Sequence, residues 1–127
     1  MDFVIEYGAE PQDVTITTSG IADVAGFGRL NSVLRSDPRF QADLTILYDL
    51  TKLDISRLSE QDIEEITDSI TERDWDSLPG AVARIVPSPE AIDPARLAIA
   101  HLGGKQSRRR VFTSRDDGIA WLRAQRS

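Results

Sequence analysis

The stretch Leu44-Thr45-Ile46-Leu47-Tyr48-Asp49-Leu50, or LTILYDL, decides the fold. Its nearly continuous apolar character is typical of a central strand that is covered on both faces. The strongest helical pattern follows it, because Ile63, Ile66 and Ile70 keep the spacing of one buried stripe. A buried strand followed by an amphipathic helix is one half of a β-α-β unit, so the sequence predicts an α/β domain around this stretch.

The residues before this stretch predict a hairpin and a helix. Apolar side chains alternate with others over 3–7 and again over 14–18, which indicates an antiparallel hairpin with a loop longer than two residues. A helix is predicted from Ile21 to Ser36, with Ser19 as its N-cap and Asp37-Pro38 as its end.

Two glycines inside that predicted helix need an explanation, because glycine weakens a helix interior by about 1 kcal/mol relative to alanine. They are Gly26 and Gly28. One interpretation is close packing of the helix on the sheet. The other is that they open space for a ligand, which would be lined by Phe27, Leu30 and Trp121.

The residues after the central stretch predict two more strands and three helix starts. Residues 81–86 and 110–113 have strand patterns, and Asp93-Pro94 begins a predicted helix that ends at Gly103-Gly104. Ser59 with Asp62 three residues later resembles a capping box, and Ser114 is expected to cap a last helix anchored by Trp121 and Leu122.

The predicted order of the elements is β-β-α-β-α-β-α-β-α. Right-handed crossovers make the later strands parallel, so we expect one domain over 1–127, a mixed sheet of about five strands flanked by about four helices.

Composition and chain pattern favour a cytoplasmic location. The chain has 127 residues and no cysteine, which fits a reducing compartment and removes disulfides and thiolate chemistry. No apolar run reaches the length of a membrane span, and the first residues lack the features of a signal peptide.

The charges are unevenly distributed along the chain. Residues 1–80 hold 17 acidic and 6 basic residues, whereas residues 81–127 hold 4 acidic and 9 basic ones, including Lys105 and the run 108–110. The basic run contains no aromatic residue that could stack on bases, and the net charge is −6, so we predict no nucleic-acid partner. The alternatives are a solvated loop before a strand, or a surface that meets the acidic half of a second copy. Two-fold dimers are the commonest oligomers, so we expect a homodimer.

Residues for catalysis or metal binding are few. His101 is the only histidine of the sequence, and no partner that would orient it as a base is evident from spacing. The segment 103–107 lacks the order of a phosphate loop, and the acidic residues over 60–68 are interpreted as a solvated helix face. We therefore predict no enzyme activity, no metal and no cofactor.

Two segments carry a resemblance to a known family. They are DPRF (37–40) followed by LTILYDLTKLDISRLSEQDIEEI (44–66), and RVFTSRDDGIAWL (110–122). They resemble the SpoIIAA-like proteins, small bacterial relatives of the STAS (anti-anti-sigma factor) domain that are also linked to the CRAL-TRIO lipid-exchange fold. The resemblance covers roughly 17–122 and implies the architecture predicted above.

The resemblance also implies a candidate phosphoacceptor. In phosphorylatable STAS proteins the central strand ends in Asp-Leu and leads to an Asp-Ser-Ser-Gly motif. Asp49-Leu50 matches the strand end, and Ser59 falls at the second serine of that motif. Arg57, Leu58 and Glu60 replace the other positions, so the segment that a kinase would read differs. Helix capping is the alternative role of Ser59.

Three functions remain open on the sequence. The leading hypothesis is a non-enzymatic module that binds a protein partner or itself. The second is a carrier of a small apolar or anionic, lipid-like molecule, held near Phe27, Leu30 and Trp121. The third is a regulator of the anti-anti-sigma type that is switched by phosphorylation of Ser59.

Overall fold

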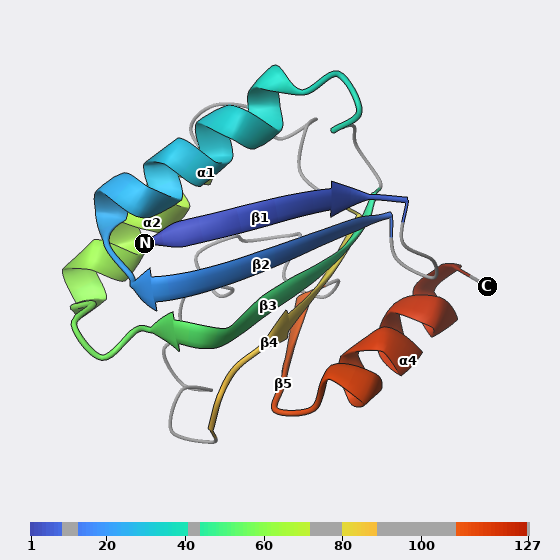
Figure 1. The fold of residues 1–127 in the computed structure, drawn as a ribbon. Helices are drawn as coiled ribbons and strands as arrows, with labels where there is room; N and C mark the ends of the chain where they lie inside the picture. Colours follow the sequence, from blue (N-terminus) through green and yellow to red (C-terminus); the bar gives the residue numbers. More distant parts are fainter. Residues whose placement is uncertain (9–12, 41–43, 72–79, 89–108, 127) are drawn as a thin grey trace.

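The computed structural model describes residues 1–8, 13–40, 44–71, 80–88 and 109–126, and the fold below is that of these residues (Figure 1). Their elements, in chain order, are β1 (Asp2–Tyr7), β2 (Val14–Ile21), α1 (Val24–Ser36), β3 (Thr45–Asp54), α2 (Glu60–Thr71), β4 (Ala81–Ile85), β5 (Arg109–Phe112) and α4 (Arg115–Arg126). The predicted helix after Asp93-Pro94 lies outside the described residues, as do His101 and the segment 103–107.

The strands form one five-stranded mixed sheet in the order β1-β2-β3-β4-β5. β1 and β2 are antiparallel, and each later strand is parallel to its neighbour. The predicted hairpin and mixed sheet are therefore confirmed. Each strand lies beside its predecessor in the chain, and right-handed crossovers in such a sheet place the connecting helices on the same face. Figure 1 shows α1 and α2 on one side of the sheet and α4 on the other.

The face under α1 and α2 holds most of the core. One cluster of buried side chains joins β2, β3 and β4 to α1: Val14, Ile16, Leu30, Leu34, Ile46 and Val82. A second cluster lies nearer the C-terminal end of β3: Ala22, Leu50, Leu53 and Val86. The inner residues of α2, Ile63 and Ile66, are buried as their spacing predicts.

The opposite face is packed against α4 with small side chains. Leu122 of α4 is fully buried among Leu47, Ala81, Ala83 and Ile85. Because the two strand alanines are short, the helix backbone comes close to the sheet: a Cβ built on Gly118 would lie 2.5 Å from Cδ1 of Ile85. Trp121 packs beside this cluster, with its ring centre 6.0 Å from that of Phe112.

The start of α1 corrects one prediction. Ser19 and Ile21 belong to β2, which continues three residues beyond the predicted strand because it pairs with the long β3 as far as Asp54. The N-cap is Asp23 instead of Ser19, and its carboxylate accepts a hydrogen bond from the backbone N–H of Gly26. The helix therefore begins later than its apolar pattern predicted.

The two glycines of α1 have different surroundings. A Cβ on Gly26 would lie 2.8 Å from both Oδ1 of Asp23 and Sδ of Met1, so close packing is confirmed at this position. A Cβ on Gly28 would meet no atom within 4 Å, because Gly28 is on the solvent side. Val33 also faces solvent and is 48% exposed, so the apolar side of α1 is narrower than predicted.

Candidate functional site

The middle of β3 is held by a network centred on Asp49, because the strand continues to Asp54 instead of ending at Asp49-Leu50 as the resemblance implied. Asp49 as a whole residue is 9% exposed. Its Oδ1 accepts hydrogen bonds from Thr51, at 2.9 Å from the backbone N–H and 2.6 Å from the hydroxyl. Its Oδ2 forms a 3.0 Å ion pair with Nη1 of Arg115, at the start of α4. Both carboxylate oxygens are engaged, so Asp49 fixes the first turn of α4 against the sheet.

Ser59, the candidate phosphoacceptor, is in a complete capping box. Its hydroxyl accepts a 3.0 Å hydrogen bond from the backbone N–H of Asp62, and its own N–H donates to Oδ2 of Asp62 at 3.0 Å. The predicted cap of α2 is thus confirmed, with aspartate in the place of the usual glutamate. Ser59 is exposed at the helix start, but Glu60 and Asp62 in the first turn add negative charge beside it.

The three residues predicted to line a ligand cavity lie on different faces of the sheet. Phe27 and Leu30 pack with the α1 cluster. Trp121 packs on the opposite face, beside Leu122 and Phe112. The reason is topological, since Trp121 belongs to the helix after the last strand and α1 is a crossover helix. These residues do not line one common space.

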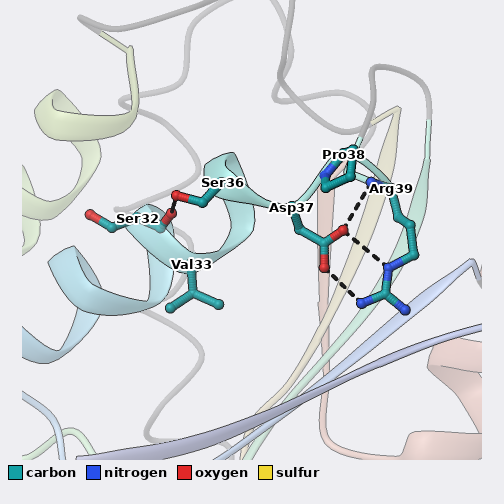
Figure 2. Close-up of a pocket in the computed structure, with 6 residues that line it drawn as sticks. All are labelled: Ser32, Val33, Ser36, Asp37, Pro38 and Arg39. Atoms are coloured by element: carbon teal, nitrogen blue, oxygen red, sulfur yellow. Dashed lines mark hydrogen bonds and ion pairs between the residues drawn. The ribbon is translucent and has the colours of Figure 1, made fainter.

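An open hollow follows the outer side of α1 and the turn after it (Figure 2). Its volume is about 670 Å³, and its lining residues are Ser32, Val33, Ser36, Asp37, Pro38 and Arg39. Figure 2 shows the guanidinium of Arg39 facing the carboxylate of Asp37, at 2.7 Å between Nη2 and Oδ2. The same guanidinium lies 4.1 Å from the ring centre of Tyr7. Its charged group is therefore already engaged with Asp37 and Tyr7.

Hydrogen bonds from Arg39 to the Asp37 carboxylate hold the pKa of this acid below its ordinary value. A second hollow of about 590 Å³ adjoins the first along α1 and is lined by Phe3, Gly28, Arg29, Asn31, Ser32, Val33 and Arg35. Both hollows are open surface depressions, and neither buries a group that would select a ligand.

A partly buried arginine on β4 is the feature that sequence reasoning missed. Arg84 lies beside Tyr48 in the register of β3 and β4, with its guanidinium carbon 6.0 Å from the Tyr48 ring centre. Its Nη1 is buried and has no hydrogen-bond partner among the described residues. Burial lowers the pKa of Arg84 and raises that of Tyr48 well above its usual range. The sequence offers one indication of this environment: Arg84 is the single charged residue within the otherwise apolar run 81–86.

The described parts of the chain offer no assembled metal site, since no group of three or more His, Asp or Glu side chains converges there. Within the same ranges, no helix combines the length and the apolar character needed to cross a bilayer.

This mixed five-stranded sheet with helices on both faces has the architecture of the SpoIIAA-like fold. Among solved structures, the chain is similar to an uncharacterised protein of the DUF3478 family from Shewanella loihica PV-4, described as having a SpoIIAA-like fold. The TM-score is 0.64 at 18% sequence identity, over 95% of this chain and 92% of that one. The likeness at this identity shows the fold, and the fold predicted from the sequence is confirmed. The sequence matches no family model and no curated protein.

Proposed function

We propose that this chain is a non-enzymatic interaction module that binds another protein along β1. The observation that carries the proposal is the half-covered sheet. α4 packs mainly on β3, β4 and β5, and it leaves the same face of β1 open. Val4 at the centre of β1 is consequently 58% exposed, although it belongs to a sheet that is otherwise well covered.

The side chains around Val4 indicate the chemistry of the partner. Asp2, Val4 and Glu6 alternate with inward-facing residues and share the open face, so an apolar side chain stands between two exposed acids. β1 is also the edge of the described sheet, and an edge strand can accept main-chain hydrogen bonds from an added strand. A complementary segment is extended, with basic residues on both sides of an apolar one.

The same charges oppose pairing of β1 with β1 of a second copy. An antiparallel pair centred on Val4 would place Asp2 of one copy opposite Glu6 of the other, and directly opposed like charges destabilise a sheet. A homodimer, which the uneven charge of the chain suggests, would use another surface. Native mass spectrometry at micromolar concentration measures whether such a dimer forms.

The experiment that tests the proposal is an NMR titration of the ¹⁵N-labelled chain with a synthetic peptide that alternates lysine and valine. We expect the amide signals of β1 to shift, and the matched peptide that alternates glutamate and valine to leave them in place. Val4→Lys should weaken the response without lowering the midpoint of thermal unfolding, because Val4 is exposed. The proposal fails if the basic peptide leaves the β1 amides unchanged.

A phosphorylation switch at Ser59 is an alternative that rests on position. Ser59 is exposed at a helix start, where free N–H groups and the helix dipole favour a phosphate. The neighbouring acids oppose it. Incubation with a bacterial lysate and labelled ATP, followed by peptide mapping, tests this alternative; label on Ser59 in the wild type and none in Ser59→Ala would support it.

A carrier of a small molecule is the second candidate function. The predicted lining residues do not support it, because Phe27 and Trp121 lie on opposite faces of the sheet.

A further inference from the structure

α1 and the turn after it follow β1 along its whole length. Near the start of the strand, Nη2 of Arg29 donates a 3.4 Å hydrogen bond to the carbonyl oxygen of Met1. At the end of the strand, the guanidinium of Arg39 lies 4.1 Å from the ring centre of Tyr7. The helix therefore runs in the same direction as β1, which is the edge of the described sheet (Figure 1).

The flank of α1 that faces β1 carries an exposed apolar side chain, Val33. Val33 lies four residues after Arg29, which reaches Met1, so the two side chains share this flank. Val33 also precedes the buried Leu34, yet it is 48% exposed. It lines the second hollow together with Phe3, whose side chain is on the α1 side of β1. The second hollow therefore opens beside the edge of β1.

A strand that pairs with β1 would use both sides of this edge. Its side chains would point alternately to the two faces of the sheet. On the open face they would meet Asp2, Val4 and Glu6. On the other face they would meet Phe3 and Val33, in the second hollow. One added strand would thus cover the exposed valines on both sides of the edge.

The charges of the two sides determine which side chains of the partner enter the hollow. Asp2 and Glu6 attract basic residues on the open face. The described lining of the second hollow contains Arg29 and Arg35 and no acidic residue. Lysine is therefore favoured on the open face and repelled from the hollow, which leaves the inner positions to uncharged side chains.

We propose that the second hollow receives apolar side chains of the segment that binds β1. The partner is an extended segment whose basic residues face Asp2 and Glu6 and whose alternate, inner residues are apolar and pack on Phe3 and Val33. Burial of this apolar surface adds to the affinity in proportion to the area removed from water. The inference rests on the proposed function, because it needs a strand paired with β1, and it adds the identity of the inner side chains.

The test compares two synthetic peptides by NMR titration of the chain, labelled with ¹⁵N and with ¹³C in the valine methyl groups. One peptide alternates lysine and valine, and the other alternates lysine and threonine. Threonine is β-branched and favours strands as valine does, but it carries a hydroxyl. We expect the valine peptide to bind about 10-fold more tightly and to shift the methyl signals of Val33 together with the β1 amides.

A substitution in the hollow tests the same contact from the side of the protein. Val33→Thr should weaken the valine peptide about 3-fold and leave the affinity of the threonine peptide unchanged. Ile21→Thr is the matched control, because Ile21 is 43% exposed but lies in β2 beyond the residues that pair with β1. This control should bind both peptides as the wild type does.

The outcomes separate this inference from the proposed function. Equal affinity of the two peptides, with shifted β1 amides, would keep the pairing with β1 and overturn the role of the hollow. Methyl signals of Val33 that stay in place while the β1 amides shift would have the same meaning, as would equal affinity of the valine peptide for the wild type and Val33→Thr. If neither peptide shifts the β1 amides, both proposals fail.

Discussion

The two faces of the sheet solve the problem of burial in different ways. The face under α4 is lined by short side chains such as Ala81 and Ala83, and its charged groups lie at the rim, where Asp49 meets Arg115. The face under α1 and α2 carries long side chains, among them Tyr48 and the partly buried Arg84. The first face is a packing surface. The second combines packing with a polar group that packing does not require.

This difference teaches where to look for function in a small α/β domain. Close contact of α4 with the sheet leaves no space for a ligand on that face, since even a methyl group on Gly118 would collide with Ile85. The Nη1 atom of Arg84 is buried with no hydrogen-bond partner among the described residues, and such an atom reduces stability unless something compensates it. Stability and function can therefore be separated by comparing equivalent substitutions on the two faces.

The largest effect is expected from leucine truncation. Leu122 on the α4 face and Leu30 on the α1 face are both fully buried. Leu122→Ala should lower the free energy of unfolding by about 4 kcal/mol, because the alanines near Leu122 are too short to fill the cavity that it leaves. Leu30→Ala should lower it by about 3 kcal/mol, because Phe27 and other long side chains near Leu30 can move into the space. Urea unfolding measures both. A smaller loss in Leu122→Ala than in Leu30→Ala would contradict the rigid packing of the α4 face.

The same contrast predicts opposite signs for two glycine substitutions. Gly118→Ala should destabilise the protein by about 2 kcal/mol, since the new methyl group would lie 2.5 Å from Cδ1 of Ile85. Gly28→Ala should stabilise it by about 1 kcal/mol, since this helical position is open and alanine has the higher helix propensity. Thermal unfolding of the two variants beside the wild type checks the signs. Destabilisation by Gly28→Ala would mean that α1 is covered at this position.

Removing a helix cap should lower the free energy of unfolding by less than these substitutions, and by different amounts on the two sides of the sheet. Ser59→Ala removes a reciprocal capping box and should cost about 1 kcal/mol. Ser114→Ala removes one longer contact, 3.4 Å to the N–H of Asp117, and should cost about 0.5 kcal/mol. Chemical unfolding of both variants provides the comparison. Equal losses of stability in the two variants would show that the longer hydrogen bond of Ser114 is as strong as those of the capping box at Ser59.

The smallest effect is expected in the pH dependence of stability, at Asp37 on the α1 side of the sheet. Hydrogen bonds from Arg39 lower the pKa of Asp37 in the folded state. A lowered folded pKa adds stability above the unfolded value, and this contribution is lost as the pH falls through the folded pKa, below about pH 4. Asp37→Asn should flatten the dependence of the urea midpoint on pH between 5 and 2.5. An unchanged slope would place the acid sensitivity in other carboxylates.

Much of the fold could be predicted because the sequence signals are local and strong. The apolar stretch 44–50 became the middle strand, and Ser59 with Asp62 began α2 as a capping box. Ser19 was wrong as an N-cap because pairing with β3 kept it in a strand, and such pairing is not visible in local propensity. Strand order also depends on contacts between distant segments, so no local pattern in the sequence sets it.

The candidate site was harder to predict than the fold. Phe27, Leu30 and Trp121 seemed equivalent as large apolar residues near helix patterns, but the side of the sheet that each helix covers is a property of the whole topology. Arg84 was interpreted as one residue of a strand, because strand patterns with period two do not reveal whether a face is open or covered. Its significance depends on burial, which only the assembled sheet defines.

The sequential strand order has a consequence for how the protein is made. Each strand pairs with the one synthesised just before it, so the sheet can grow from β1 to β5 as the chain emerges, without waiting for a distant segment. The exception is the α4 face, whose cover is synthesised after all five strands. Until then Leu47 and Ile85 have no helix over them, and the nascent chain exposes an apolar surface that a chaperone or a second nascent chain can bind.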